Sequence, residues 1–243
     1  MNFATAGEFA SSSAACSAAM VRRARVPVFH ASPGGRSPKL YNINMKLYAT
    51  MLIALLPALA AAPVVDKAKA LGNPGAPVEI EVYASFDCPH CKVLHETTIP
   101  LLVKDYVASG KVFLVQREFP LWGPYHPYAW QAAQYATAAA RVGRYDQVSN
   151  ALFAAQANWA TTGRVWDTVA AALPPADQKK VQELAKDPGV IAEVQRDHDE
   201  GVAAGITATP TVFVINGSKR YPIPATQLEY SFLKSLLDGF LKK

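Results

Sequence analysis

The pattern of hydrophobic and polar positions identifies strands at the start of the folded part of the chain. Residues 78–84 alternate between apolar and polar side chains and are rich in β-branched residues, which predicts a strand. A helix is expected from Pro89 towards Gly110, with a kink near Pro100, because proline cannot donate a hydrogen bond to the carbonyl of Glu96. Residues 111–118 predict a second strand.

The pattern then becomes helical over about residues 124–204. Helices are expected in five stretches rich in Ala, Gln, Glu and Leu, at residues 128–141, 145–157, 161–173, 176–186 and 188–201. Two strand-like runs follow, at 211–215 and 220–223, and Asn216-Gly217 between them predicts a hairpin. Residues 226–242 predict an amphipathic helix. The order is therefore strand, helix, strand, helical block, hairpin and helix.

The residues before the first strand predict export. Met45 and Lys46 begin a short basic start, an apolar run follows, and Ala58-Leu59-Ala60 fits a cleavage site, so residues 45–60 are interpreted as a signal peptide. An uncleaved membrane anchor is the alternative. Residues 61–75 mix Ala, Pro, Gly and Lys and are interpreted as a linker to a folded domain at 76–243.

Residues 1–44 are interpreted as a non-globular upstream segment. They are rich in Ala and Ser and show no apolar periodicity. Because a signal peptide does not work 44 residues into a chain, we expect translation to start at Met45. The alternative is an organelle transit peptide, which the Arg-rich stretch 22–25 and the near-absence of acidic residues would suit.

Charge and composition exclude several classes of protein. The net charge of +5 falls in residues 1–60, which hold six basic residues and one acidic residue, whereas the rest holds 18 of each. A neutral folded part lacks the basic surface that nucleic acid requires, so no nucleic-acid partner is expected. The apolar share of 51% excludes a disordered chain, and three cysteines are too few for a disulfide-stapled mini-protein.

The chemistry of the chain is concentrated in Cys88-Pro89-His90-Cys91. With Pro89 at the first helical position, Cys88 is the N-cap, and its sulfur faces unpaired N–H groups and the positive end of the helix dipole. Both favour the reactive thiolate, and a protonated His90 would stabilise it further. Cys91 lies one turn further in, where it is suited to attack a mixed disulfide at Cys88.

The pair has three other interpretations. A zinc site completed by His90 or His95 lacks a second pair of cysteines, so no metal is expected. A purely structural disulfide in so small a ring restricts the unfolded chain little. Two buried thiols would oxidise in an exported chain. A redox-active pair that needs no cofactor is therefore favoured.

These motifs resemble the DsbA-like branch of the thioredoxin superfamily. The resemblance covers residues 76–243 and rests on 86–91 after a strand, on 117–121 with His126-Pro127, and on 205–213 late in the chain. It implies an α/β, thioredoxin-like fold with an inserted all-helical domain. The Pro-His dipeptide between the cysteines implies an oxidising pair. The resemblance also implies a cis bond at Thr209-Pro210, opposite the cysteines, where substrate peptide would bind.

The chain departs from this family pattern at one position. Many relatives carry a buried carboxylate six residues before the first cysteine, where it assists proton transfer, but here that residue is Val82. Strand alternation puts Glu81 on the opposite face. Water or Glu118 would then accept and return the proton of Cys91. A nearby Asp87 would raise the pKa of Cys88 and oppose the helix dipole.

Other residues have weaker signals. His95 is expected to be solvated, and His126 and His198 are expected to be structural. Four aromatic residues at the entry to the helical block are expected to pack at a domain junction, with a hydrophobic substrate surface as the alternative: Trp122, Tyr125, Tyr128 and Trp130.

The sequence thus predicts a thiol–disulfide oxidoreductase in the periplasm or another extracytoplasmic compartment. We expect an oxidase that donates the Cys88–Cys91 disulfide to cysteine-containing exported proteins and is re-oxidised by a membrane-bound thiol oxidase. A disulfide reductase or isomerase is the alternative enzyme. A peptide-binding holdase with a merely structural disulfide is the alternative outside enzymes, and activity that survives Cys88→Ser would favour it.

Overall fold

The computed structural model describes residues 66–242. The expected signal peptide at 45–60, the segment 1–44 before it and residues 61–65 of the expected linker lie outside the described residues. Within residues 66–242, none of the helices is both long enough and apolar enough to span a bilayer.

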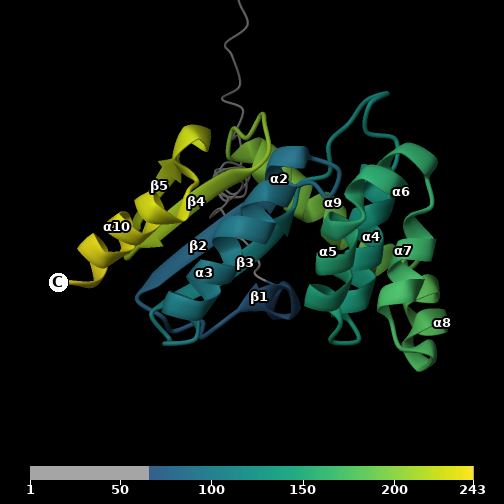
Figure 1. Ribbon diagram of the computed structural model, residues 1–243, viewed down its shortest axis with the longest axis horizontal. Helices are drawn as coiled ribbons and strands as arrows, with labels where there is room; N and C mark the ends of the chain where they lie inside the picture. Colours follow the sequence, from purple (N-terminus) through teal and green to yellow (C-terminus); the bar gives the residue numbers. More distant parts are fainter. Residues whose placement is uncertain (1–65, 243) are drawn as a thin grey trace, which may run out of the picture. The chain divides into compact units, whose positions relative to one another are not determined.

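Five strands form one mixed sheet (Figure 1). The central strand β2 (Val78–Ala84) pairs in parallel with β3 (Val112–Glu118) and antiparallel with β4 (Thr211–Asn216). The hairpin expected at Asn216-Gly217 is confirmed, with Gly217 at φ 61° and β5 (Lys219–Ile223) antiparallel to β4. On the other side, β1 (Ala70–Leu71) pairs antiparallel with β3. The strand order is β1-β3-β2-β4-β5.

The run after β2 stays helical past the proline that was expected to kink it. It consists of α2 (Pro89–Val93), the π-helical segment η3 (Leu94–Thr98), α3 (Ile99–Leu102) and a second π-helical segment, η4 (Val103–Val107). The N–H of Ile99 bonds to the carbonyl of Leu94, five residues earlier. Such a widened turn takes up the missing N–H of Pro100 without ending the helix.

The helical block lies between β3 and β4, as the pattern predicts. It comprises α4 (Ala129–Ala140), α5 (Tyr145–Ala154), α6 (Gln156–Thr162), α7 (Val165–Ala172), α8 (Pro175–Leu184) and α9 (Pro188–Ala203). The single helix expected at 161–173 is broken at Gly163, whose φ is 74°. A Cβ there would lie 2.7 Å from the ring of Tyr128, so both the turn and the packing require glycine.

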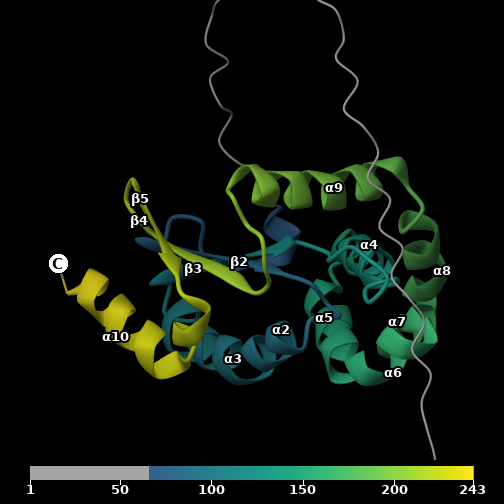
Figure 2. The same ribbon diagram turned by 90° about the horizontal axis from the view of Figure 1, so that it is seen from above.

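Helices cover both faces of the sheet (Figure 2). On one face α9 packs against β3, and its Gly201 allows the ring of Phe119 to approach so closely that a Cβ would lie 2.6 Å away. The other face carries α2, α3 and α10 (Tyr230–Leu241) over a core that includes Ile80, Leu114 and Leu237. The expected final helix begins only at Tyr230, because a short 3₁₀ turn, η5 (Ala225–Gln227), precedes it.

The described part of the expected linker belongs to the folded domain. A 3₁₀ turn, η2 (Lys67–Lys69), leads directly into β1. Lys69 is 2% exposed, and its ammonium group pairs with Glu193 at 3.1 Å and with Asp197, both on α9. Because this segment contains few apolar residues, its sequence did not indicate that Lys69 would be buried against two carboxylates.

The fold class expected from the sequence, an α/β thioredoxin-like fold with an inserted all-helical domain, is confirmed.

Candidate active site

The two cysteines lie at the start of α2, between the sheet and the helical block. Cys88 is the N-cap of α2 with extended backbone angles, Pro89 occupies the first helical position, and the N–H of Lys92 bonds to the carbonyl of Cys88 at 3.1 Å. Both cysteines are free thiols, with Cys88 5% and Cys91 1% exposed. The positions expected from the sequence at the N-cap and one turn further in are therefore the ones observed.

The surroundings of the two sulfurs push their pKa values in opposite directions. The Cys91 thiol donates a hydrogen bond to the sulfur of Cys88, and this bond lowers the pKa of Cys88 most. Hydrogen bonds from Thr209 and from the backbone N–H groups of Cys91 and His90 lower it further. The resulting pKa is about 5, although burial acts in the opposite direction. Burial and the adjacent sulfur of Cys88 raise the pKa of Cys91 well above its usual value. At neutral pH the arrangement therefore holds one thiolate, on Cys88, and one protonated thiol, on Cys91.

His90 lies at the rim of the site. Its side chain is exposed, and its influence on the pKa of Cys88 comes through its backbone N–H. The sequence interpretation gave this influence to the protonated imidazole. The structure assigns it to the geometry of the helix terminus, which Pro89 helps to fix.

A loop far away in the sequence meets the cysteines. The Thr209-Pro210 peptide bond is cis, as the resemblance implied. The sulfur of Cys88 lies 3.3 Å from the carbonyl oxygen of Thr209, across 121 positions of sequence, and donates a hydrogen bond to it when the thiol is protonated. The expectation that Thr209-Pro210 lies opposite the cysteines is therefore confirmed by this contact.

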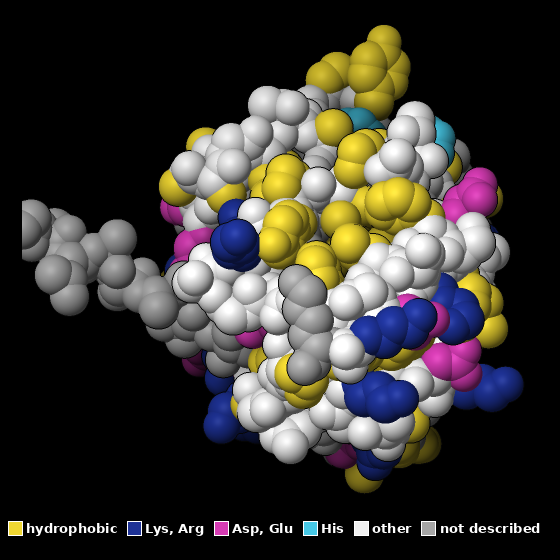
Figure 3. Space-filling view, turned by 90° about the vertical axis from the view of Figure 1, so that its left-hand side faces the viewer, with side chains coloured by type: hydrophobic (Ala, Val, Ile, Leu, Met, Phe, Trp, Pro, Cys, Tyr) yellow, Lys and Arg dark blue, Asp and Glu magenta, His cyan; other side chains and the backbone are white. Residues whose placement is uncertain are grey.

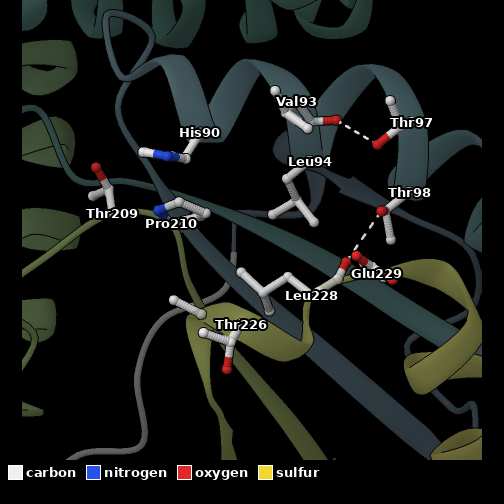
Figure 4. A pocket seen from close by; sticks show the side chains of 11 residues that line it. His90, Val93, Leu94, Thr97, Thr98, Thr209, Pro210, Thr226, Leu228 and Glu229 are labelled. Carbon is white, nitrogen blue, oxygen red and sulfur yellow. Dashed lines mark hydrogen bonds between the residues drawn. The ribbon is translucent and has the colours of Figure 1, made fainter.

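An apolar cavity of about 430 Å³ begins at this loop and lies between α2, η3 and the chain that leads into α10. Leu94 and Leu228 point into it from opposite sides, and the hydroxyl of Thr98 closes the far end by donating to the carbonyl of Leu228 at 3.1 Å (Figure 4). Hydrophobic side chains also gather on the molecular face that carries β5 and α10 (Figure 3). The cavity walls include His90, Val93, Thr97, Thr209, Pro210, Thr226 and Glu229.

The carboxylates near the strand ends are held away from the cysteines. Val82 is 3% exposed and lines the space behind Cys91. Glu81 points to the other face, as alternation predicts, and pairs with Arg117 at 3.3 Å and Arg220 at 2.7 Å.

Glu118, considered as a proton acceptor for Cys91, does not line the space behind that residue. Its carboxylate accepts a hydrogen bond from the hydroxyl of Tyr145 at 2.9 Å, and burial raises its pKa to about 7. The end of β3 thus turns this side chain towards α5 and Lys69, and a role of Glu118 towards the proton of Cys91 stays a prediction that these contacts do not support.

Asp87 is the acidic neighbour that was expected to oppose the thiolate. One of its carboxylate oxygens accepts a hydrogen bond from the hydroxyl of Ser85 at 2.5 Å, and the other is hydrogen-bonded to Nδ1 of His126 at 2.6 Å. The pKa of Cys88 is lowered despite this neighbour. His126, expected to be merely structural, thus orients the loop in front of Cys88.

Gln156 is a site residue that the sequence did not reveal. Its amide donates to the carbonyl of Phe86 at 2.6 Å and to that of Cys88 at 3.0 Å, and its side chain is buried. It therefore anchors the residues on both sides of Asp87 to the helical block. A single glutamine in an Ala-rich helical stretch gives no signal of such a role.

Two of the four aromatic residues at the entry to the helical block are exposed. Tyr125 is 89% and Trp122 67% exposed, and Trp122 packs against Trp130 and His198 with ring centroids at 4.5 and 6.3 Å. Tyr128 packs against the turn at Gly163. The interpretation as junction packing therefore holds for Tyr128 and Trp130, whereas Trp122 and Tyr125 leave an aromatic surface open.

The chain is similar to known proteins over most of the described residues. A family model described as Thioredoxin matches residues 65–238. "Probable disulfide bond formation protein D" of Bacillus anthracis is 26% identical over 184 residues, which are 72% of this chain and 79% of that protein.

Two solved structures share this arrangement. The oxidised BdbD of Bacillus subtilis aligns with a TM-score of 0.58 and 23% identity, over 72% of this chain and 93% of that one. A thioredoxin-like oxidoreductase from Silicibacter pomeroyi aligns with a TM-score of 0.57 and 25% identity, over 73% and 95%. The similarity spans the sheet and the helical insertion together.

Proposed function

Since this chain belongs to the thioredoxin family and is a DsbA-like thiol–disulfide oxidoreductase, we propose that Cys88 and Cys91 form its redox centre and that it acts as an oxidase of exported proteins. The observation that carries the proposal is the opposite shift of the two thiol pKa values. A thiol of low pKa is a good leaving group, so a disulfide that contains Cys88 is readily given away.

The proposed reaction has two exchange steps. A substrate thiolate attacks the sulfur of Cys88 in the Cys88–Cys91 disulfide, the S–S bond breaks, and its electron pair leaves with Cys91, which takes up a proton. A second substrate thiolate then attacks the substrate sulfur of the mixed disulfide, and Cys88 leaves as a thiolate. Two electrons and one proton have entered the pair, and the substrate holds a new disulfide.

The loop at Thr209 and the neighbouring cavity support a place for the substrate. An extended peptide that pairs with the backbone at Thr209 brings its cysteine to the sulfur of Cys88, which lies 3.3 Å from the Thr209 carbonyl. Apolar side chains next to that cysteine then enter the cavity between Leu94 and Leu228. Recognition by backbone and apolar contacts suits an enzyme that accepts many unfolded chains.

The proposed site of action is outside the cytoplasm, in the periplasm or an equivalent compartment. The signal-peptide pattern at 45–60 supports this, and an uncleaved pattern would leave the enzyme anchored to a membrane. Each turnover leaves the pair reduced, so an oxidant must remove two electrons. A membrane-bound thiol oxidase is the proposed partner, with cysteine-containing exported proteins as substrates.

An equilibrium titration of the Cys88–Cys91 pair against glutathione tests the proposed direction. We expect a potential above about −200 mV, in the range of oxidising members of the superfamily. A potential of about −270 mV, as in reducing thioredoxins, would refute the proposed oxidase function and favour a reductase. Cys88→Ser serves as the control. If this variant kept full activity towards reduced, unfolded substrates, the holdase interpretation would replace both enzymes.

A further inference from the structure

The proton of Cys91 needs an acceptor that the sheet does not supply. Cys91 is 1% exposed, and Val82 occupies the strand position next to it, where relatives are expected to carry a carboxylate. When Cys91 attacks a mixed disulfide at Cys88, it must lose its proton, and when it leaves the disulfide it must gain one. The surroundings of Cys91 should therefore contain a group that exchanges a proton with it.

A small cavity behind Cys91 contains one such group. The cavity has a volume of about 10 Å³, which is close to the space of one water molecule, and it is lined by Cys91, His95, Gln116 and apolar residues. His95 follows Cys91 by four positions on the same helical run, so both side chains face this space. Of the described side chains around the cavity, Gln116 is a neutral amide, and His95 is the one base.

The imidazole of His95 is held by its contacts. Its ring packs on Phe153 with centroids 4.5 Å apart, and its Nε2 lies 2.7 Å from Oδ1 of Asn150 on α5. An amide oxygen accepts hydrogen bonds and does not donate them, so Nε2 carries the hydrogen and Nδ1 keeps its lone pair. The ring is therefore set in the tautomer that accepts a proton at Nδ1.

The other side of His95 reaches the surface. A second cavity of about 290 Å³ shares His95 and Gln116 with the small one and is also lined by Asp146 and Asn150, which are exposed. A proton taken up by the ring can therefore leave to solvent. The charged groups that face His95 are Glu96 on its own helical run and Asp146 on α5, and Lys92 pairs with Glu96 at 3.6 Å.

We propose that His95 is the proton acceptor and donor of Cys91, in place of the strand carboxylate that this chain lacks. The inference rests on the proposed roles of the two cysteines. In the release step, the Cys91 thiol passes its proton to Nδ1 of His95, directly or across the one-water cavity, as its sulfur attacks Cys88. The Cys88–Cys91 bond forms, the bond from Cys88 to the substrate sulfur breaks, and the substrate leaves as a thiolate. Disulfide donation uses the same path in reverse.

The protonation state of His95 fits this role. Burial lowers the pKa of His95, although the hydrogen bond to Asn150 and the charges of Glu96 and Asp146 act in the opposite direction. The ring is therefore neutral at pH 7 and ready to accept a proton. This corrects the expectation that His95 is simply solvated, because the side chain is half-buried between the redox pair and α5.

The test is the pH dependence of a single release step. Cys88 is loaded with a small chromogenic thiol as a mixed disulfide, and its release by Cys91 is followed in wild type and His95→Gln from pH 5 to 9. In wild type, release should rise as His95 deprotonates and then stay level through neutral pH. In His95→Gln the rate of release should be about 100-fold lower at pH 7 and should rise about tenfold per pH unit, because hydroxide takes the place of the imidazole as the base.

Controls separate this role from a structural one. Glu96→Gln alters the neighbouring residue on the same turn and should keep the level region of the profile. The rate at which a small reagent alkylates Cys88, followed against pH, should be the same in His95→Gln as in wild type if the loop is intact. Added imidazole should speed release in His95→Ala.

An identical release profile in wild type and His95→Gln would overturn the inference while leaving the two cysteine roles in place. If Cys91→Ala released the thiol as fast as wild type, the proposed roles of the cysteines would fail, and the inference would fail with them.

Discussion

The low pKa of Cys88 should make the reduced protein more stable than the oxidised one in a pH-dependent way. The pKa of this thiol falls from 9.0 in the unfolded chain to about 5 in the folded protein, and the shift stabilises the folded state above pH 5. The stabilisation reaches its full size above pH 9 and is lost as the pH falls through 5. At pH 7 it amounts to about two pKa units, or about 2.7 kcal/mol. For a two-electron couple the same free energy raises the reduction potential by about 60 mV.

Denaturant unfolding of the oxidised and reduced forms between pH 5 and 7 measures this contribution. Groups that titrate alike in both forms cancel in the difference, and the small ring of the disulfide adds a part that does not depend on pH. We expect the free energy of unfolding of the reduced form, relative to the oxidised form, to grow by about 2.3 kcal/mol from pH 5 to pH 7. Cys88→Ser, which has no thiolate at this position, should follow the pH dependence of the oxidised form. A difference that stays constant over this range would refute the shifted pKa.

Two further predictions concern the contacts that hold the site and the first strand. Gln156→Leu should lower the free energy of unfolding by about 1–3 kcal/mol, because the Phe86 carbonyl loses its hydrogen-bond donor. The Cys88 carbonyl keeps the hydrogen bond from the N–H of Lys92. Gln195→Leu, at an exposed position, should change the free energy of unfolding by less than about 0.5 kcal/mol in the same urea titration. Lys69→Met should cost about 3 kcal/mol, since two buried carboxylates lose a partner, whereas the exposed Lys67→Met should be nearly neutral. Equal effects of either variant and its control would contradict the assigned contacts.

The sequence predicted the parts of the site that depend on local geometry. A proline after a cysteine fixes the helix start, so the N-cap position of Cys88 and the deeper position of Cys91 follow from four adjacent residues. The hairpin follows from Asn216-Gly217 in the same way. The meeting of Thr209-Pro210 with Cys88 could be expected only from the family resemblance, because 121 positions separate the two residues that touch.

The remaining features depend on contacts between distant elements, which no local pattern encodes. The burial of Lys69 comes from carboxylates on α9, more than 120 residues later. The position of Glu118 is set by Tyr145, and strand alternation alone could not show towards which helix its carboxylate turns. The break at Gly163 has a local signal, a glycine within a helical stretch, but its cause is the ring of Tyr128 against that turn.

The helical insertion takes part in the proposed redox site, and its helix α9 also covers one face of the sheet. Gln156 on α6 holds the backbone of Cys88, and Asn150 on α5 sets the tautomer of His95 behind Cys91. His126, just before α4, binds the carboxylate beside Cys88. The sheet and α2 supply the sulfurs, whereas these polar contacts come from the insertion. Substitutions in the insertion that leave the sheet unchanged should therefore alter the potential and the proton exchange of the pair separately, through Gln156 and Asn150 respectively.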